Sequence, residues 1–195
     1  MNHTAASDGM DHFSNQSKSA ALPGAATPRL ADWRANAADG LVFIALGSNL
    51  GDRAANIRGA LHELERAGVA RLIQCSRLVE TDAVGGPADQ PRYLNGVARL
   101  ATSLDPHELL IALLRVEQLF GRVRDERNAP RTLDLDLLLY GSLRLTSTRL
   151  TLPHPRMWDR DFVMTPLAEV CDAAWLETVR TAAPAREQKE PVDVR

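Results

Sequence analysis

The sequence predicts an α+β fold of the ferredoxin-like plan, with helices packed on one face of a mainly antiparallel sheet. The segments follow the order β-α-β-β-α-β, two of them combine helical spacing with capping residues, and no segment repeats. With 195 residues, 45% of them hydrophobic, the chain suffices for one core and is short for two enzymatic domains. A sheet covered on one face leaves its other face available for a site.

The first predicted strand and helix are separated by a short turn. The continuous apolar run Leu41–Leu46 indicates a buried strand, and Gly47-Ser48-Asn49 indicates the turn after it. Asp52 is in position to cap a helix that ends before Gly68. The apolar side chains of this helix recur at helical spacing: Ile57, Leu61 and Leu64.

The second helix has the clearest end signals in the chain. Asp105 is its predicted N-cap, Pro106 suits the first turn, Glu108 occupies the capping-box position, and Gly121 ends the helix. Its predicted buried face consists of Leu109, Leu110, Leu113, Val116 and Phe120.

The remaining strands are predicted from apolar and β-branched runs between turn residues. Residues 69–80 and 93–102 are expected to be extended, with a loop at 84–91. Residues 133–140 are expected to form a strand, followed by a turn and a further extended piece to residue 152.

Three regions differ in composition. Residues 1–40 are rich in Ser, Ala, Asn, Gly and Pro with no helical or strand period, which predicts a disordered extension. Residues 41–174 are the predicted domain, and residues 175–195 are a tail that we expect to be partly disordered.

Charge and cysteine usage exclude several functional classes. Lys+Arg at 23 nearly balances Asp+Glu at 25, so no bulk field attracts the protein to nucleic acid or anionic lipid. Cys75 and Cys171 lack the spacing of a zinc or redox motif and are expected to be free thiols in a reducing cytosol. No membrane-spanning run or targeting peptide is recognisable, so the expected location is the cytoplasm.

A pair of carboxylates is the first candidate for chemistry. Strand alternation places Asp134 and Asp136 on one face, opposite Leu133, Leu135 and Leu137. Such neighbours repel unless a hard cation lies between them, and Mg²⁺ binds through one or two carboxylates together with substrate phosphates. The alternative is a solvated strand face.

An arginine-rich loop directly precedes this strand. Arg122, Arg124, Arg127 and Arg131 can each form bidentate bonds to phosphate oxygens. The alternative is an exposed loop of mixed charge, since residues 125–126 are acidic. Arginines beside a carboxylate pair indicate polyphosphate binding more specifically than either feature alone.

Aromatic and polar residues elsewhere suggest a site for a flat ring. Tyr93 and Phe162 can stack on a heterocycle, and Asn95 offers both a donor and an acceptor to its edge. Core packing is the alternative for both aromatics. The sequence has neither GxxxxGK[ST] nor a GxGxxG that opens a helix, so ATP as substrate has to be held by side chains and metal.

Taken in order, these segments resemble the 6-hydroxymethyl-7,8-dihydropterin pyrophosphokinase family over about residues 41–170. The motifs that carry the resemblance are FIALGSNL at 43–50, QPRYLN at 90–95, GRVR at 121–124, PRTLDLD at 130–136, LTLPH at 150–154 and RDF at 160–162. The resemblance implies a ferredoxin-like α/β/α sandwich, usually monomeric. Pro155 stands where the family often has a tyrosine.

The resemblance also implies roles for individual residues. Asp134 and Asp136 are expected to hold two Mg²⁺ ions on ATP, and Arg122, Arg124 and Arg131 to act in catalysis. The expected pterin contacts are Thr81, Val84, Tyr93, Asn95 and Phe162. The expected ATP contacts are Glu117, Arg122, Arg131, His154 and Arg160.

The implied reaction transfers the β,γ-pyrophosphoryl group of ATP to the pterin hydroxymethyl group and releases AMP, as a step of folate synthesis. Two other functions fit parts of the pattern. An RNA-binding module of this fold stacks bases on several sheet aromatics, but aromatics make up only 5% of this chain. A DxD nucleotidyltransferase shares the metal and ATP but releases pyrophosphate instead of AMP.

Overall fold

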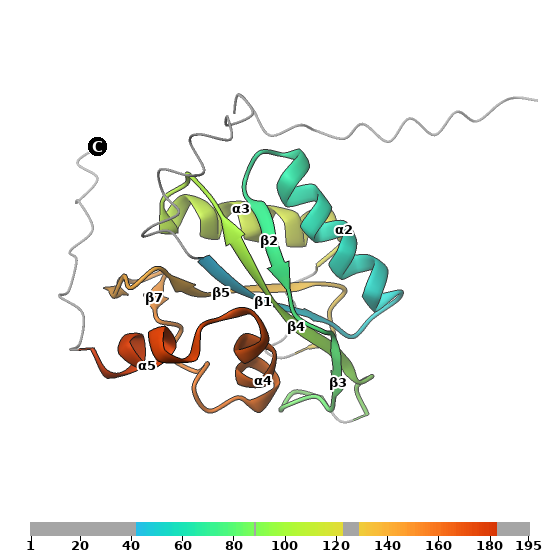
Figure 1. The fold of residues 1–195 in the computed structure, drawn as a ribbon. Coiled ribbons are helices and arrows are strands. Elements are labelled where there is room, and N and C mark those ends of the chain that lie inside the picture. Colours follow the sequence, from blue (N-terminus) through green and yellow to red (C-terminus); the bar gives the residue numbers. More distant parts are fainter. Residues whose placement is uncertain (1–41, 88, 123–128, 183–195) are drawn as a thin grey trace, which may run out of the picture.

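A computed structural model describes residues 42–87, 89–122 and 129–182 of the chain (Figure 1). Its main sheet has strand order β2-β4-β1-β5, with β3 paired to β4, and all its pairings are antiparallel. The strands are β1 (Val42–Ser48), β2 (Arg71–Cys75), β3 (Val79–Thr81), β4 (Tyr93–Ala101) and β5 (Asp134–Tyr140). This order, with two helices in the connections, confirms the predicted α+β fold.

One face of the sheet is covered by α2 (Arg53–Arg66) and α3 (Pro106–Leu119) (Figure 1). Asp52 caps α2, and Asp105 with Glu108 forms a capping box on α3, as the sequence predicts. Of the predicted apolar face of α3, Leu109, Leu113 and Val116 are fully buried, whereas Leu110 and Phe120 are partly buried at its margin.

The opposite face carries two further helices, α4 (Asp161–Val170) and α5 (Ala173–Thr181) (Figure 1). Phe43 from β1 and Val97 from β4 form a second core with Val163, Leu167 and Val179 from these helices. The sheet is therefore covered on both faces, as the α/β/α arrangement requires, and only part of the second face stays open.

The C-terminal part begins with a short hairpin of β6 (Leu145–Thr146) and β7 (Thr151–Leu152). Helix α5 then continues beyond residue 174, where the sequence suggests the end of the domain, and its Trp175 ring lies 5.7 Å from that of Phe43. Cys75 and Cys171 are both free thiols. Among the described helices, none has the length and apolarity required to span a membrane.

Candidate active site

A cavity opens on the part of the second sheet face that α4 and α5 leave uncovered. Its wall includes residues from β1, β3, β4 and β5, together with the loop before α4 and the first turn of α4. The cavity brings together these residues that the sequence predicts for the site: Thr81, Val84, Tyr93, Asn95, Arg122, Arg131, Asp134, Asp136, His154, Arg160 and Phe162. They come from segments far apart in the chain, so only the folded sheet makes them neighbours.

The floor of the cavity is the central strand, which presents very small residues there. Ala45 and Gly47 of β1 line the cavity, between β4 on one side and β5 on the other. In the strand register Gly47 lies opposite both Asn95 and Asp134. A Cβ at Gly47 would lie 3.1 Å from Asn95 Oδ1 and 3.5 Å from Asp134 Cβ, so glycine keeps open the space between the two sides.

The two aspartates lie on the cavity side of β5, as strand alternation predicts. Leu133, Leu135 and Leu137 point into the core under α2 and α3 instead. Burial, and then the neighbouring Asp134 carboxylate, raise the pKa of Asp136. A buried carboxyl group whose pKa is raised by burial and by a second carboxylate beside it indicates a place where positive charge binds.

Arg122 and Arg131 supply positive charge in the present state of the site. Arg122 Nη1 is 2.6 Å from Asp134 Oδ1, and Arg131 Nη1 is 3.1 Å from the same oxygen. Glu117 lies behind the cavity, 1% exposed, where its carboxylate pairs with Arg122 and accepts a 2.8 Å hydrogen bond from Leu135 N. Glu117 thus holds Arg122 and does not line the cavity.

The β3–β4 side of the cavity carries the residues expected to contact a flat ring. Asn95 Nδ2 donates to Thr81 Oγ1 at 2.7 Å, which fixes the orientation of its amide. Tyr93 lies opposite Thr81 in the strand register, and burial raises the pKa of its hydroxyl group. Across the cavity, Phe162 in the first turn of α4 packs beneath the Arg160 guanidinium, 5.5 Å from Cζ to the ring centre.

The loop before α4 contributes His154, Arg156 and Arg160 to the wall. Burial lowers the pKa of His154, which favours the neutral imidazole. Its Nδ1 accepts a 3.3 Å hydrogen bond from Arg156 N, so the neutral ring carries its proton on Nε2 and can donate it to an oxygen. Arg156 is a third basic group in this wall that the sequence analysis did not single out.

The last residue of β1 and the turn after it have a role that the sequence analysis missed. Asn49, 2% exposed, accepts from Arg131 N at 2.7 Å and donates to Pro91 O at 3.1 Å. Ser48 Oγ donates to Thr132 O at 2.6 Å. The turn therefore joins the segment of Arg131 to the segment before Tyr93. In the sequence, this role could have been recognised from Ser48 and Asn49, two polar residues where a buried apolar strand ends.

Some predicted residues lie outside the described part of the chain. Arg124 and Arg127 belong to residues 123–128, and residues 1–40 are likewise outside it. Their expected roles stay predictions.

The donor set can be compared with the metal that the sequence suggests. No group of three or more His, Cys, Asp or Glu arranged to hold a metal occurs in residues 42–87, 89–122 and 129–182. Two carboxylates of Asp134 and Asp136 remain, a hard oxygen set that suits Mg²⁺ when substrate phosphates and water complete the coordination.

Comparison with known proteins gives the family. The model of the 7,8-dihydro-6-hydroxymethylpterin-pyrophosphokinase family (HPPK) matches residues 43–172, more than half of the chain. Curated relatives named 2-amino-4-hydroxy-6-hydroxymethyldihydropteridine pyrophosphokinase include one from Pseudomonas aeruginosa, 50% identical over 66% of this chain and 79% of its own length. Another from Bacillus subtilis is 40% identical over 78% of this chain and 94% of its own length.

The match covers smaller shares of other relatives. It spans 64% of the pyrophosphokinase from Synechocystis sp., at 47% identity. It spans 25% of the "Folate synthesis bifunctional protein, mitochondrial" from Pisum sativum, at 46% identity. The resemblance stated from the motifs is confirmed: the chain belongs to the 7,8-dihydro-6-hydroxymethylpterin-pyrophosphokinase family.

Proposed function

We propose that this chain transfers the β,γ-pyrophosphoryl group of ATP to the hydroxymethyl group of 6-hydroxymethyl-7,8-dihydropterin. As a family member it is an ATP-dependent diphosphotransferase of folate biosynthesis. One observation supports the assignment to this site: a single cavity is lined by two aspartates, two arginines and two aromatic residues. These are Asp134 and Asp136, Arg122 and Arg131, and Tyr93 and Phe162.

The bonds made and broken follow from the products. The hydroxymethyl oxygen attacks the β-phosphorus of ATP, and the bond from that phosphorus to the α,β-bridging oxygen breaks. AMP leaves with the bridging oxygen, and the hydroxyl proton passes to solvent. Such transfers need little covalent help from a protein, so positioning and charge compensation account for most of the catalysis.

Asp134 and Asp136 are proposed to hold two Mg²⁺ ions together with the ATP phosphates. Bound Mg²⁺ supplies charge neutralisation on the phosphates and a lowered pKa for the attacking hydroxyl group. The carboxylates face the cavity side by side, and burial already disfavours the ionised form of Asp136 in the absence of a cation, which supports this role.

The arginines are proposed to move from carboxylate to phosphate when ATP binds. Arg122 and Arg131 now share Asp134 Oδ1, an oxygen that a metal would use. Their guanidiniums remain charged at all physiological pH values and fit phosphate oxygens in bidentate geometry. Arg124 is proposed to act with them, while His154 and Arg160 bind the nucleotide from the opposite wall, and Glu117 contributes through its pairing with Arg122.

Thr81, Val84, Tyr93, Asn95 and Phe162 are proposed to form the pterin subsite. Asn95 presents an amide whose orientation is fixed, which is the chemistry that distinguishes one heterocycle edge from another. Tyr93 and Phe162 lie on different walls of the same cavity, as stacking on a ring requires.

The deciding experiment measures AMP. The purified protein is incubated with ATP, Mg²⁺ and 6-hydroxymethyl-7,8-dihydropterin, and nucleotides are separated with and without the pterin. We expect AMP only in the presence of pterin, in equal amount to the pyrophosphorylated product. Release of pyrophosphate with an adenylylated acceptor would instead indicate a nucleotidyltransferase, and binding of RNA without turnover would indicate an RNA-binding module.

We further propose that the protein works in the cytoplasm as a monomer, without nucleic acid or membrane. The near balance of 23 basic and 25 acidic residues supports the absence of nucleic acid and membrane partners, because it leaves no bulk charge to attract them. Sedimentation at micromolar concentration tests the monomer.

A further inference from the structure

We propose that Arg53, at the start of α2, is a positioning residue for the pterin subsite. It holds together the two chain segments that lead into Thr81 and Tyr93. The proposal rests on the assignment of these residues to the pterin, which is part of the proposed function.

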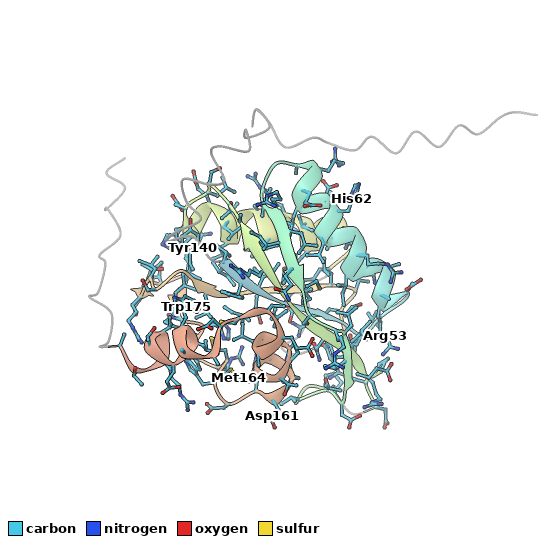
Figure 2. The ribbon with its side chains drawn as sticks, viewed as in Figure 1. Arg53, His62, Tyr140, Asp161, Met164 and Trp175 are labelled. Atoms are coloured by element: carbon cyan, nitrogen blue, oxygen red, sulfur yellow. The ribbon has the colours of Figure 1, made fainter. Side chains whose placement is uncertain are left out.

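The contacts of Arg53 reach both segments with one guanidinium. Nη2 is 2.5 Å from Glu80 Oε1, and Nη1 donates to Arg92 O at 2.9 Å. Glu80 directly precedes Thr81 in β3, and Arg92 directly precedes Tyr93 in β4. Figure 2 shows Arg53 at the end of α2 that lies beside β3. The planar fork of arginine makes the two contacts from two different nitrogens in a fixed geometry, whereas lysine has a single nitrogen.

Glu80 connects Arg53 to a second arginine. Its Oε2 is 3.3 Å from Arg92 Nη1, and Arg92 Nε is 3.0 Å from Asp82 Oδ1. Asp82 and Thr81 both line the cavity. The four charged residues thus brace the rim of the cavity where β3 ends and β4 begins, and Arg53 joins that rim to the rigid body of α2.

Helix stability does not explain an arginine at this position. The first turn of a helix carries partial positive charge, so a cation there is unfavourable and an acid is preferred. α2 has no acidic residue in its first turn and has Arg53 as its first residue. The ion pair is also partly exposed, with side-chain exposures of 31% for Arg53 and 44% for Glu80, so it adds little to global stability. Its position at the rim is better explained by the geometry that it imposes on the subsite.

The chain contains a matched control. Arg66 lies in the last turn of the same helix and pairs with Glu63 at 2.7 Å, with 44% of its side chain exposed. Neither Arg66 nor Glu63 lines the cavity. Arg53→Ala and Arg66→Ala therefore remove comparable charge and surface from one helix, but only the first alters the rim.

The test compares ligand affinities. We titrate each variant with 6-hydroxymethyl-7,8-dihydropterin in the presence of Mg²⁺ and a non-hydrolysable ATP analogue, and we titrate the analogue alone. Arg53→Ala is expected to weaken pterin binding about threefold to fivefold. It should change nucleotide binding less than about twofold and leave Tm near that of the wild type. Arg53→Lys should recover part of the pterin affinity, because it keeps the charge beside Glu80 but loses the fork.

A double variant tests whether Arg53 and Glu80 act together. If they form one brace, Arg53→Ala combined with Glu80→Gln weakens pterin binding no more than the worse single change. Equal pterin affinities for Arg53→Ala and Arg66→Ala would overturn the proposal, as would equal losses of pterin and nucleotide affinity. Lack of pterin-dependent AMP formation by the wild type is a different result, because it would refute the proposed function itself.

Discussion

Two carboxyl groups with the same chemistry have different surroundings in the cavity. Asp134 forms ion pairs with Arg122 and Arg131. The pKa of Asp136, by contrast, is raised by burial and by the Asp134 carboxylate. The sign of this shift matters for stability. An ionised acid whose folded-state pKa is raised destabilises the fold above that pKa, and replacing it by a neutral isostere removes the cost.

Asp134→Asn and Asp136→Asn are expected to lower turnover on the order of 100-fold to 1000-fold, because each removes a charge needed at the transition state. Pterin-dependent AMP formation measures the loss. Asp136→Asn should melt no lower than the wild type at neutral pH, since the buried ionised group is gone. Near-normal turnover in either variant would contradict the metal-binding role.

Arg122→Ala is expected to slow the transfer step more than it weakens pterin binding. Arg122 forms ion pairs with Asp134 and Glu117, whereas Asn95 donates its hydrogen bond to Thr81. A single-turnover rate lower by about 100-fold, with pterin Kd changed less than about threefold, would match its role at the phosphates. The same variant leaves the buried Glu117 without this cation, so its Tm has to be measured alongside. An unchanged single-turnover rate would refute the role.

At the scale of elements, the helix ends follow local rules closely. Asp105 accepts from His107 N and Glu108 N, and Glu108 in turn accepts from Asp105 N. This reciprocal pattern requires only residues that are neighbours in sequence, which is why α3 could be predicted with its boundaries. The same helix carries Glu117, which holds Arg122, so its stability bears on the site.

Asp105→Ala is expected to cost about 1 kcal/mol of unfolding free energy, because two backbone donors lose their acceptor. For a domain of this size that corresponds to a Tm lower by about 2–4 °C. Urea denaturation measures the change. Asp105→Asn keeps a capping oxygen and should lose less than half as much; equal losses for both variants would mean that the cap does not account for the effect.

The elements that the sequence did not predict depend on distant contacts. No helix was predicted after residue 152, yet α4 and α5 supply four of the nine buried residues of the second core: Val163, Leu167, Val170 and Val179. Pro166 inside α4 weakens the local helix signal, and α5 has only nine residues. Both are stabilised by packing on Phe43 and Val97, which no local pattern reveals.

The candidate site could be predicted in part for a similar reason. Strand alternation sufficed for Asp134 and Asp136, but the roles of Asn49 and Arg53 arise from partners 27 to 82 positions away in the sequence. These roles could not be predicted from residue type, because an Asn in a turn and an Arg on a helix are both common.

At the scale of the whole molecule, the central strand joins the two cores. Val42, Ile44 and Leu46 of β1 pack under α2 and α3, whereas Phe43 packs under α5. The same strand forms the cavity floor at Ala45 and Gly47. Ligand binding to this floor is therefore expected to stabilise the domain as a unit, because both cores share the strand.

A non-hydrolysable ATP analogue with Mg²⁺ is expected to raise Tm. At a concentration of 100 times its Kd, it should add about 2–3 kcal/mol to the free energy of unfolding. Adding EDTA should remove most of this increase, because Asp134 then repels the phosphates that it otherwise binds through the metal. Differential scanning fluorimetry with and without chelator measures both effects. An equal Tm increase in EDTA would show that the arginines alone bind the nucleotide.

The absence of a side chain at Gly47 limits how the cavity can change by mutation. At Gly47 the cavity floor is strand backbone, hydrogen-bonded to neighbouring strands on both sides, so no side chain there can be shortened. Every replacement makes the cavity shallower, because its Cβ crowds Asn95 Oδ1 and comes into contact with Asp134. Variants that accept bulkier rings must therefore gain room at the rim, where Val84 is exposed, and not at the bottom.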